Sequence, residues 1–91
     1  MMYDLRFEKE AENDLAKLKK SEKTAYKKVV KLLDELQEHP TTGTGKPERL
    51  KHYTEPTWSQ RISDKHRLVY RIYDEVVVVF VISAYGHYED K

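Results

Sequence analysis

Cysteine is absent from the 91-residue sequence, so the chain forms no disulfide and offers no thiolate ligand to a metal ion. Long apolar runs are absent too: the longest, residues 76–82, is far shorter than the roughly 20 residues that cross a bilayer. Near the N-terminus an acid, Asp4, stands where a secretory signal would be basic and then apolar. These absences predict a soluble, cytoplasmic protein with no membrane partner.

Internal repeats, low-complexity stretches and candidate domain boundaries are missing as well, which predicts one domain spanning residues 1–91. A domain this short buries only a modest core, so its stability should be marginal. The sequence contains neither a carboxylate cluster nor a His-x-x-x-His pair, the patterns that would indicate a metal site. We therefore expect neither a metal nor another cofactor.

Charge is distributed unevenly along the chain, although the net charge is only +1. Residues 46–73 contain seven basic and three acidic side chains, and residues 17–31 contain seven lysines and one acid. Local positive fields, rather than total charge, attract phosphate backbones, so both segments are candidate nucleic-acid surfaces. The alternative for the lysines is that they form only the solvated face of a helix.

The hydrophobic periodicity predicts elements in the order β-α-α-β-β-β. Strands are expected at residues 2–7, 57–63, 67–73 and 76–83, and helices at residues 8–20 and from Ser21, as N-cap, to just before Pro40. Two helices joined so closely should form an antiparallel hairpin, and the short connections make the last three strands an antiparallel meander. The expected fold is α+β, with the hairpin packed on one face of a small sheet.

Packing of the helices on the sheet requires matching apolar faces. In strands 57–63 and 67–73, this places Ile62 opposite Leu68 and Gln60 opposite Tyr70, through a three-residue connection at 64–66. In the second helix, the expected apolar stripe is Ala25, Tyr26, Val29, Val30, Leu33 and Leu36.

The other face of the same two strands is rich in arginine. Arg61 and Arg67 are expected to lie diagonal to each other, where their guanidinium groups would form a phosphate cradle. The alternative is that these arginines only solubilise an exposed sheet face, which antiparallel sheets commonly have. The residues that share this face are Ser59, Arg61, Arg67, Val69 and Arg71.

Cleavage of RNA through the ribose 2′-hydroxyl needs a base for the 2′ proton, a cation for the phosphorane charge and an acid for the leaving 5′ oxygen. Glu48, expected on a loop tip, is the candidate base, Arg67 the candidate phosphate clamp and His87 the candidate acid. Tyr85 and Tyr88 are candidates for stacking on bases. Taken singly, the glutamate is explained by a surface ion pair and the terminal histidine as inert. Only their coincidence favours a nuclease.

Five short motifs resemble the YoeB/Txe branch of the RelE-type toxins, in the right order and spacing over almost the whole chain. They are Gly45-Lys46-Pro47-Glu48, Leu50-Lys51-His52, Trp58-Ser59-Gln60-Arg61-Ile62, His66-Arg67-Leu68-Val69-Tyr70 and Gly86-His87-Tyr88. The resemblance implies a RelE-like toxin of a type II toxin–antitoxin pair, acting as a ribosome-dependent endoribonuclease on mRNA. It also implies a YefM-like antitoxin as partner.

The resemblance assigns roles to residues at matching positions. It implies Glu48 as general base, Arg67 as the phosphate-stabilising arginine and His87 as general acid, with Tyr88 beside it. The lysine-rich helices would then dock on ribosomal RNA. The candidate RNA contacts around the site are Lys46, Lys51, His52, Arg61 and Tyr85.

The sequence departs from the family pattern in two places and leaves alternatives open. Gln60 stands where a second arginine is common, and residues 89–91 continue past the usual end with two acids. One alternative is a ParE-like toxin that poisons DNA gyrase and needs no pair of base and acid. Another is an attenuated relative that only binds the ribosome or an antitoxin. A monomer and a homodimer are both compatible with this size.

Overall fold

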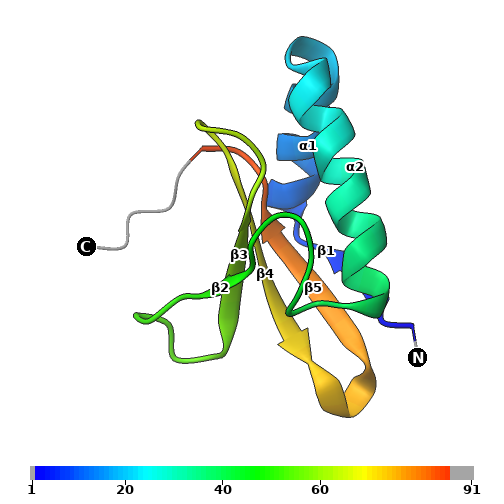
Figure 1. Ribbon diagram of the computed structural model, residues 1–91, viewed down its shortest axis with the longest axis vertical. Coiled ribbons are helices and arrows are strands. Elements are labelled where there is room, and N and C mark those ends of the chain that lie inside the picture. The colour runs from blue at the N-terminus through cyan, green and yellow to red at the C-terminus, as the bar shows by residue number, and fades with distance from the viewer. Residues whose placement is uncertain (1, 87–91) are drawn as a thin grey trace.

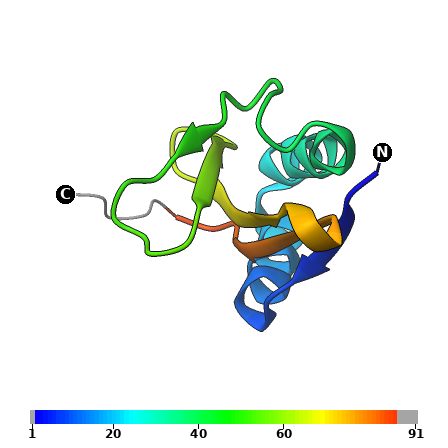
Figure 2. The same cartoon turned by 90° about the horizontal axis from the view of Figure 1, so that it is seen from below.

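Two helices lie on one side of a five-stranded sheet in the computed structural model, which describes residues 2–86 (Figures 1 and 2). The sheet order is β1-β5-β4-β3-β2, with β1 parallel to β5 and every other pair antiparallel. The elements are β1 (Asp4–Phe7), α1 (Lys9–Ser21), α2 (Lys23–Glu38), β2 (Glu48–Arg49), β3 (Thr57–Arg61), β4 (Arg67–Tyr73), a 3₁₀ helix (Asp74–Val76) and β5 (Val78–Ser83).

This architecture confirms the predicted α+β fold, the helical hairpin and the antiparallel meander of the last three strands. It adds β2, a strand of two residues that is too short to show a periodic pattern in the sequence. It also shortens β5, because Asp74–Val76 form the 3₁₀ helix and Val77 adopts a left-handed φ of 55° before the strand begins. Between residues 2 and 86, neither helix combines the length and the apolar character needed to cross a membrane.

Ser21 does not cap the second helix, contrary to the prediction. It is the last residue of α1, and its hydroxyl donates to the Lys17 carbonyl oxygen at 2.9 Å, the back-bonding that serine makes within helices. Glu22 separates the two helices, with φ −138° and ψ 72°, and makes no side-chain cap. The helix break therefore leaves the Glu22 carboxylate available for a contact elsewhere.

The buried stripe of α2 differs from the prediction at one turn. Leu32 is fully buried, whereas Val30 is 42% exposed and Leu33 is only half-buried. The period runs 25, 29, 32, 36, which is the narrow seam of a helix packed against one neighbouring layer. The core cluster comprises Ala11, Leu18, Ala25, Val29, Leu32, Leu36, Ile62, Leu68, Tyr70, Val79, Val81 and Ala84.

The pairing of β3 with β4 is shifted by two residues from the predicted register. Gln60 lies opposite Leu68 rather than Tyr70, and Arg61 lies opposite Arg67 rather than diagonal to it. The cause is a five-residue connection, in which the Ser63 hydroxyl accepts the backbone N–H of both Lys65 and His66 at 3.2 Å. A shift of two keeps every side chain on its predicted face, because side-chain direction alternates with a period of two.

Candidate functional site

Glu48 and Arg67 lie on the sheet face that the sequence assigned to phosphate binding. Glu48 of β2 pairs with Ser59 of β3, and Ser59 pairs with Val69 of β4, which places Glu48 within reach of Arg67. The Arg67 Nη1 atom is 3.9 Å from Glu48 Oε1 and donates to Ser59 Oγ at 3.4 Å. Arg67 is about one-quarter exposed and Glu48 is largely exposed, so a solvent-borne anion reaches both side chains.

The predicted open face is only partly open. Ser59 and Val69, which share it with the arginines, are buried, Arg67 and Arg71 are partly buried, and only Arg61 is exposed. The connection between β2 and β3 projects on the side of the sheet away from the helices (Figures 1 and 2). The site is therefore a bounded patch around Arg67 rather than an open sheet surface.

Glu48 is held in a strand rather than on a loop tip, which corrects the prediction. The Gly45 carbonyl oxygen accepts the Arg61 N–H at 2.8 Å, and the Leu50 N–H donates to the Thr57 carbonyl oxygen at 2.8 Å. These two bonds secure the chain to β3 on either side of Glu48. Because the backbone on both sides of Glu48 is restricted, its carboxylate is held in position, whereas a loop tip would leave it mobile.

The approach to Glu48 uses an uncommon backbone conformation. Lys46 has a φ of 56°, in the left-handed region that costs a non-glycine residue about 1–2 kcal/mol. Gly45 before it has no room for a side chain, since an added Cβ would lie 2.8 Å from the Gln60 Cβ and 3.0 Å from Leu32 Cδ2. Lys46 itself is exposed beside the site, as a candidate RNA contact requires.

A buried hydrogen-bond network supports this loop from below. The Tyr70 hydroxyl donates to the Pro40 carbonyl oxygen at 2.6 Å and accepts the Gln60 Nε2–H at 3.0 Å. Burial raises the pKa of Tyr70 to about 12, although the hydrogen bond from Gln60 works against that rise. Gln60, the departure from the family pattern, thus points to the core side and does not belong to the phosphate face.

The described chain ends beside Arg67. The Gly86 carbonyl oxygen accepts the Arg67 backbone N–H at 3.0 Å, and Gly86 has a φ of 80°, which favours glycine. The predicted acid His87 and its neighbour Tyr88 lie outside the described residues, as does the acidic segment 89–91.

The remaining predicted RNA contacts come from β3, from the connection after β2 and from the segment after β5. Arg61 is exposed opposite Arg67 and pairs with Asp64. Lys51 and His52 are exposed on the connection that follows β2. Tyr85 is 41% exposed, but its ring lies 4.3 Å from the His66 ring between centroids, and Lys17 Nζ lies 4.8 Å from its centroid. In the free protein, the Tyr85 ring is therefore engaged with α1 and with His66.

Sequence reasoning missed three polar residues near the end of the described chain: Asp14 and His66 contact it directly, and Glu22 contacts His66. Asp14 and His66 are buried, and Glu22 is half-buried. Asp14 carried a signal, because it lies on the apolar face of α1 between Ala11 and Leu18. His66 begins one of the family-like motifs, but its contact with Glu22 was not predictable, because Glu22 lies 44 positions away in sequence. Within the described part of the chain, no three His, Asp or Glu side chains cluster closely enough to hold a metal ion.

Comparison with known families and curated proteins gives consistent matches. A family model described as the YoeB-like toxin of bacterial type II toxin–antitoxin systems matches residues 7–88. Toxin RelK of Mycobacterium tuberculosis is 34% identical over 87 residues, covering 96% of this chain and all of the relative.

Solved structures match along the same length. A YoeB/ParE toxin from Agrobacterium tumefaciens has a TM-score of 0.86 at 29% identity, covering 93% of this chain and 99% of that one. The YoeB dimer from Staphylococcus aureus has a TM-score of 0.84 at 30% identity, covering 97% and 100%. The Staphylococcus aureus protein is also solved in complex with YefM, with a TM-score of 0.80.

Proposed function

The chain belongs to the YoeB-like toxins of bacterial type II toxin–antitoxin systems, and on that basis we propose that it is a ribosome-dependent endoribonuclease that cleaves mRNA and so inhibits translation. One observation carries the proposal: Glu48 and Arg67, from different strands, lie 3.9 Å apart on one partly open face. A carboxylate beside a guanidinium group is the combination that cleavage through a 2′-hydroxyl needs at its attacking end.

In the proposed reaction, the Glu48 carboxylate removes the proton of the ribose 2′-hydroxyl, and the 2′ oxygen attacks phosphorus. Arg67 stabilises the negative charge on the phosphorane, for which its fork of N–H donors is suited. The bond from phosphorus to the 5′ oxygen then breaks, and His87 donates a proton to that oxygen, with Tyr88 assisting. The products are a 2′,3′-cyclic phosphate and a 5′-hydroxyl, and no step requires a metal.

The pairing geometry in the free protein supports these roles. At 3.9 Å the contact of Glu48 with Arg67 is long for a charge-assisted hydrogen bond. An incoming phosphate that replaces this contact therefore loses little free energy by breaking it. His87 follows Gly86 in the sequence, and the Gly86 carbonyl oxygen accepts the Arg67 backbone N–H.

We propose the RNA contacts and partners on the same basis. Lys46, Lys51, His52, Arg61 and Tyr85 contact mRNA or ribosomal RNA around the site. A YefM-like antitoxin is the protein partner, because the similar toxin from Staphylococcus aureus is solved with YefM. That toxin is also solved as a dimer, so a homodimer is a further assembly of this chain.

The experiment that tests the function maps the 5′ ends of mRNA on translating ribosomes with and without the protein. We expect new ends that carry a 5′-hydroxyl, and at least a hundredfold fewer of them with Glu48→Gln or Arg67→Ala, as for loss of a general base or a charge-stabilising group. Glu75→Gln, an exposed glutamate on the 3₁₀ helix, is the matched control and should cleave as the parent does.

Other outcomes would replace the proposal. A 5′-phosphate on the downstream fragment would indicate attack by an activated water instead of the 2′-hydroxyl. Unchanged mRNA together with gyrase-dependent DNA breaks would favour the ParE-like alternative. Ribosome binding without new ends would favour an attenuated, binding-only relative.

A further inference from the structure

Three hydrogen bonds secure the segment that follows β5. The Ala84 N–H donates to Asp14 Oδ2 at 2.9 Å, and the Gly86 N–H donates to His66 Nδ1 at 2.8 Å. The Gly86 carbonyl oxygen accepts the Arg67 N–H at 3.0 Å. Residues 84–86 are therefore fixed between α1 on one side and the start of β4 on the other.

The direction of these bonds determines the state of His66. A backbone N–H can only donate, so Nδ1 must accept and carries no proton. The ring proton is then on Nε2, which lies 3.0 Å from both carboxylate oxygens of Glu22 and donates to them. The bond from the Gly86 N–H thus requires the His66 tautomer with its proton on Nε2, and the Glu22 carboxylate stabilises that tautomer by accepting the Nε2–H.

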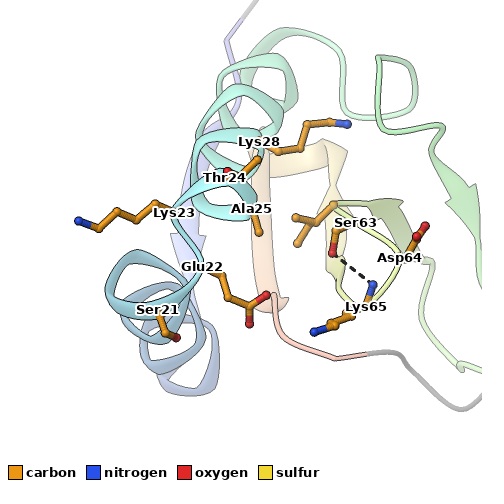
Figure 3. A pocket seen from close by; sticks show the side chains of 10 residues that line it. Ser21, Glu22, Lys23, Thr24, Ala25, Lys28, Ser63, Asp64 and Lys65 are labelled. Atoms are coloured by element: carbon orange, nitrogen blue, oxygen red, sulfur yellow. Dashed lines mark hydrogen bonds between the residues drawn. The ribbon is translucent and has the colours of Figure 1, made fainter.

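Glu22 reaches His66 because of where the helices break. It lies in the wall of a cleft of about 700 Å³ between the start of α2 and the connection from β3 to β4 (Figure 3). Its carboxylate extends from the helix junction toward the sheet side of that cleft, while Lys23 points away (Figure 3). The His66 side chain is only 4% exposed, so both of its ring nitrogens are shielded from water, whereas the Glu22 side chain is 30% exposed.

We propose that His66, oriented by Glu22, is a positioning residue for the nuclease reaction. Its Nδ1 atom fixes the Gly86 amide against Arg67 and so sets the point from which the chain continues to His87. The proposal rests on the proposed function, but His66 itself contacts no reacting atom. Small misplacement of a catalytic group is costly, on the order of a hundredfold in rate for about 1 Å.

Two substitutions separate the two nitrogens of His66. In His66→Asn, the amide oxygen takes the place of Nδ1 and still accepts the Gly86 N–H. In His66→Gln, the amide reaches the position of Nε2 and still donates to Glu22, but Gly86 loses its acceptor. We expect His66→Gln to reduce the single-turnover cleavage rate at least about tenfold below that of His66→Asn, with ribosome affinity unchanged in both. His39→Gln is the control, because His39 is an exposed histidine beside Glu38 at 3.8 Å, away from the site.

A second measurement is independent of RNA. Amide hydrogen exchange should show the Gly86 N–H protected in the parent and in His66→Asn, and exposed in His66→Gln. Glu22→Ala, at a partly exposed position, removes the acceptor of the Nε2–H without emptying the core, so the other tautomer of His66 becomes accessible and Gly86 protection should fall several-fold. Thermal unfolding of every variant shows whether the fold persists.

The outcomes are distinguishable. Equal cleavage by His66→Asn and His66→Gln, or a Gly86 amide that stays protected in His66→Gln, would overturn the positioning role and leave the nuclease assignment intact. A parent protein that cuts no mRNA would remove the nuclease assignment, while the Gly86 exchange rates would still decide whether His66 holds the segment.

Discussion

Gly45 shows how a single residue determines the position of Glu48, the proposed base. Its carbonyl bonds to β3, and its missing side chain leaves the space that Gln60 and Leu32 fill. Glu48 can approach Arg67 because the chain passes so close to the core at this point. The requirement is one of space, and it differs from that at Gly86, where an added Cβ meets nothing but φ is 80°.

Gly45→Ala should therefore destabilise the fold by about 1–3 kcal/mol, the usual cost of forcing atoms into a packed core. Chemical denaturation measures the loss, and the mapped mRNA ends should fall in parallel because Glu48 moves. The control is Gly43→Ala, which meets the flexible end of the Glu35 side chain and carries the strain of φ 131°. It should reduce stability without the same loss of cleavage. Equal stability for the parent and Gly45→Ala would contradict the packing argument.

Individual residues of the site were predictable where chemistry and spacing coincide. Glu48 and Arg67 were identified from the sequence, and the structure brings them together on the expected face. Asp14, Glu22 and His66 were not, because their importance depends on contacts between segments that are far apart in the sequence. A polar residue on the apolar face of a helix, as at Asp14, is a signal that was present in the sequence and not used.

At the scale of elements, α2 carries the most hydrophobic packing. The seam of Ala25, Val29, Leu32 and Leu36 faces the core, and Val30 lies outside it. The broader stripe expected from the sequence included apolar residues that lie to either side of this line of contact. Packing against one sheet selects the narrower set, because only residues near the line of contact lose their water.

Leu32→Ala and Val30→Ala form a matched test of that seam. Leu32→Ala should cost about 2–5 kcal/mol, since it removes buried methyl groups and leaves a cavity. Val30→Ala should change stability by less than about 0.5 kcal/mol, as is usual for exposed positions. Urea denaturation of both variants measures the difference. A similar cost for the two would mean that Val30 is covered in solution by another surface, such as a second copy of the chain.

The strands show which features of an element can be read from a sequence. Their faces were predicted, because alternation depends only on local side-chain direction. The register was wrong by two residues, since it depends on how the Ser63 hydroxyl closes the connection before His66. The strand β2 escaped prediction because two residues show no periodicity, and its pairing is decided by the backbone bonds of Gly45 and Leu50.

For the whole molecule, buried Tyr70 makes stability depend on alkaline pH. Its folded pKa is raised from about 10 to about 12, so the folded state holds the phenol proton more tightly than the unfolded chain does. This contribution is fully present below pH 10 and is lost as pH rises toward 12. The loss amounts to at most about 3 kcal/mol.

Denaturation at intervals between pH 9 and pH 12 measures this effect. The parent should lose more stability over that range than Tyr70→Phe, which has no phenol proton to release. Tyr53→Phe, at an exposed tyrosine, should follow the parent. Tyr3 and Tyr73, whose pKa values are raised by hydrogen bonds to Asp74 and Glu55, are present in all three proteins and cancel in the comparison. Parallel curves for the parent and Tyr70→Phe would contradict the prediction.

The lysines of the helical hairpin form a second candidate RNA-binding surface, on the helices rather than on the strands that carry Glu48 and Arg67. If they dock on ribosomal RNA, Lys27→Glu with Lys28→Glu should weaken ribosome binding on the order of tenfold at low salt and flatten its salt dependence. Sedimentation with ribosomes at several salt concentrations measures both quantities. The control pair Arg6→Glu and Lys9→Glu changes charge equally near β1. Equal binding by the two double variants would show that Lys27 and Lys28 form only a solvated face.

The place of β5 in the sheet has a consequence for the order in which the protein becomes active during synthesis. β5 is translated after every other element, yet it lies between β1 and β4 and pairs with both. A nascent chain that ends at β4 has a first strand with no neighbour, and contacts so distant in sequence form late and slowly. The residues proposed for RNA cleavage then become a site only once the chain has been translated through β5 and Gly86. A partner that binds during synthesis therefore meets this toxin before its sheet is complete.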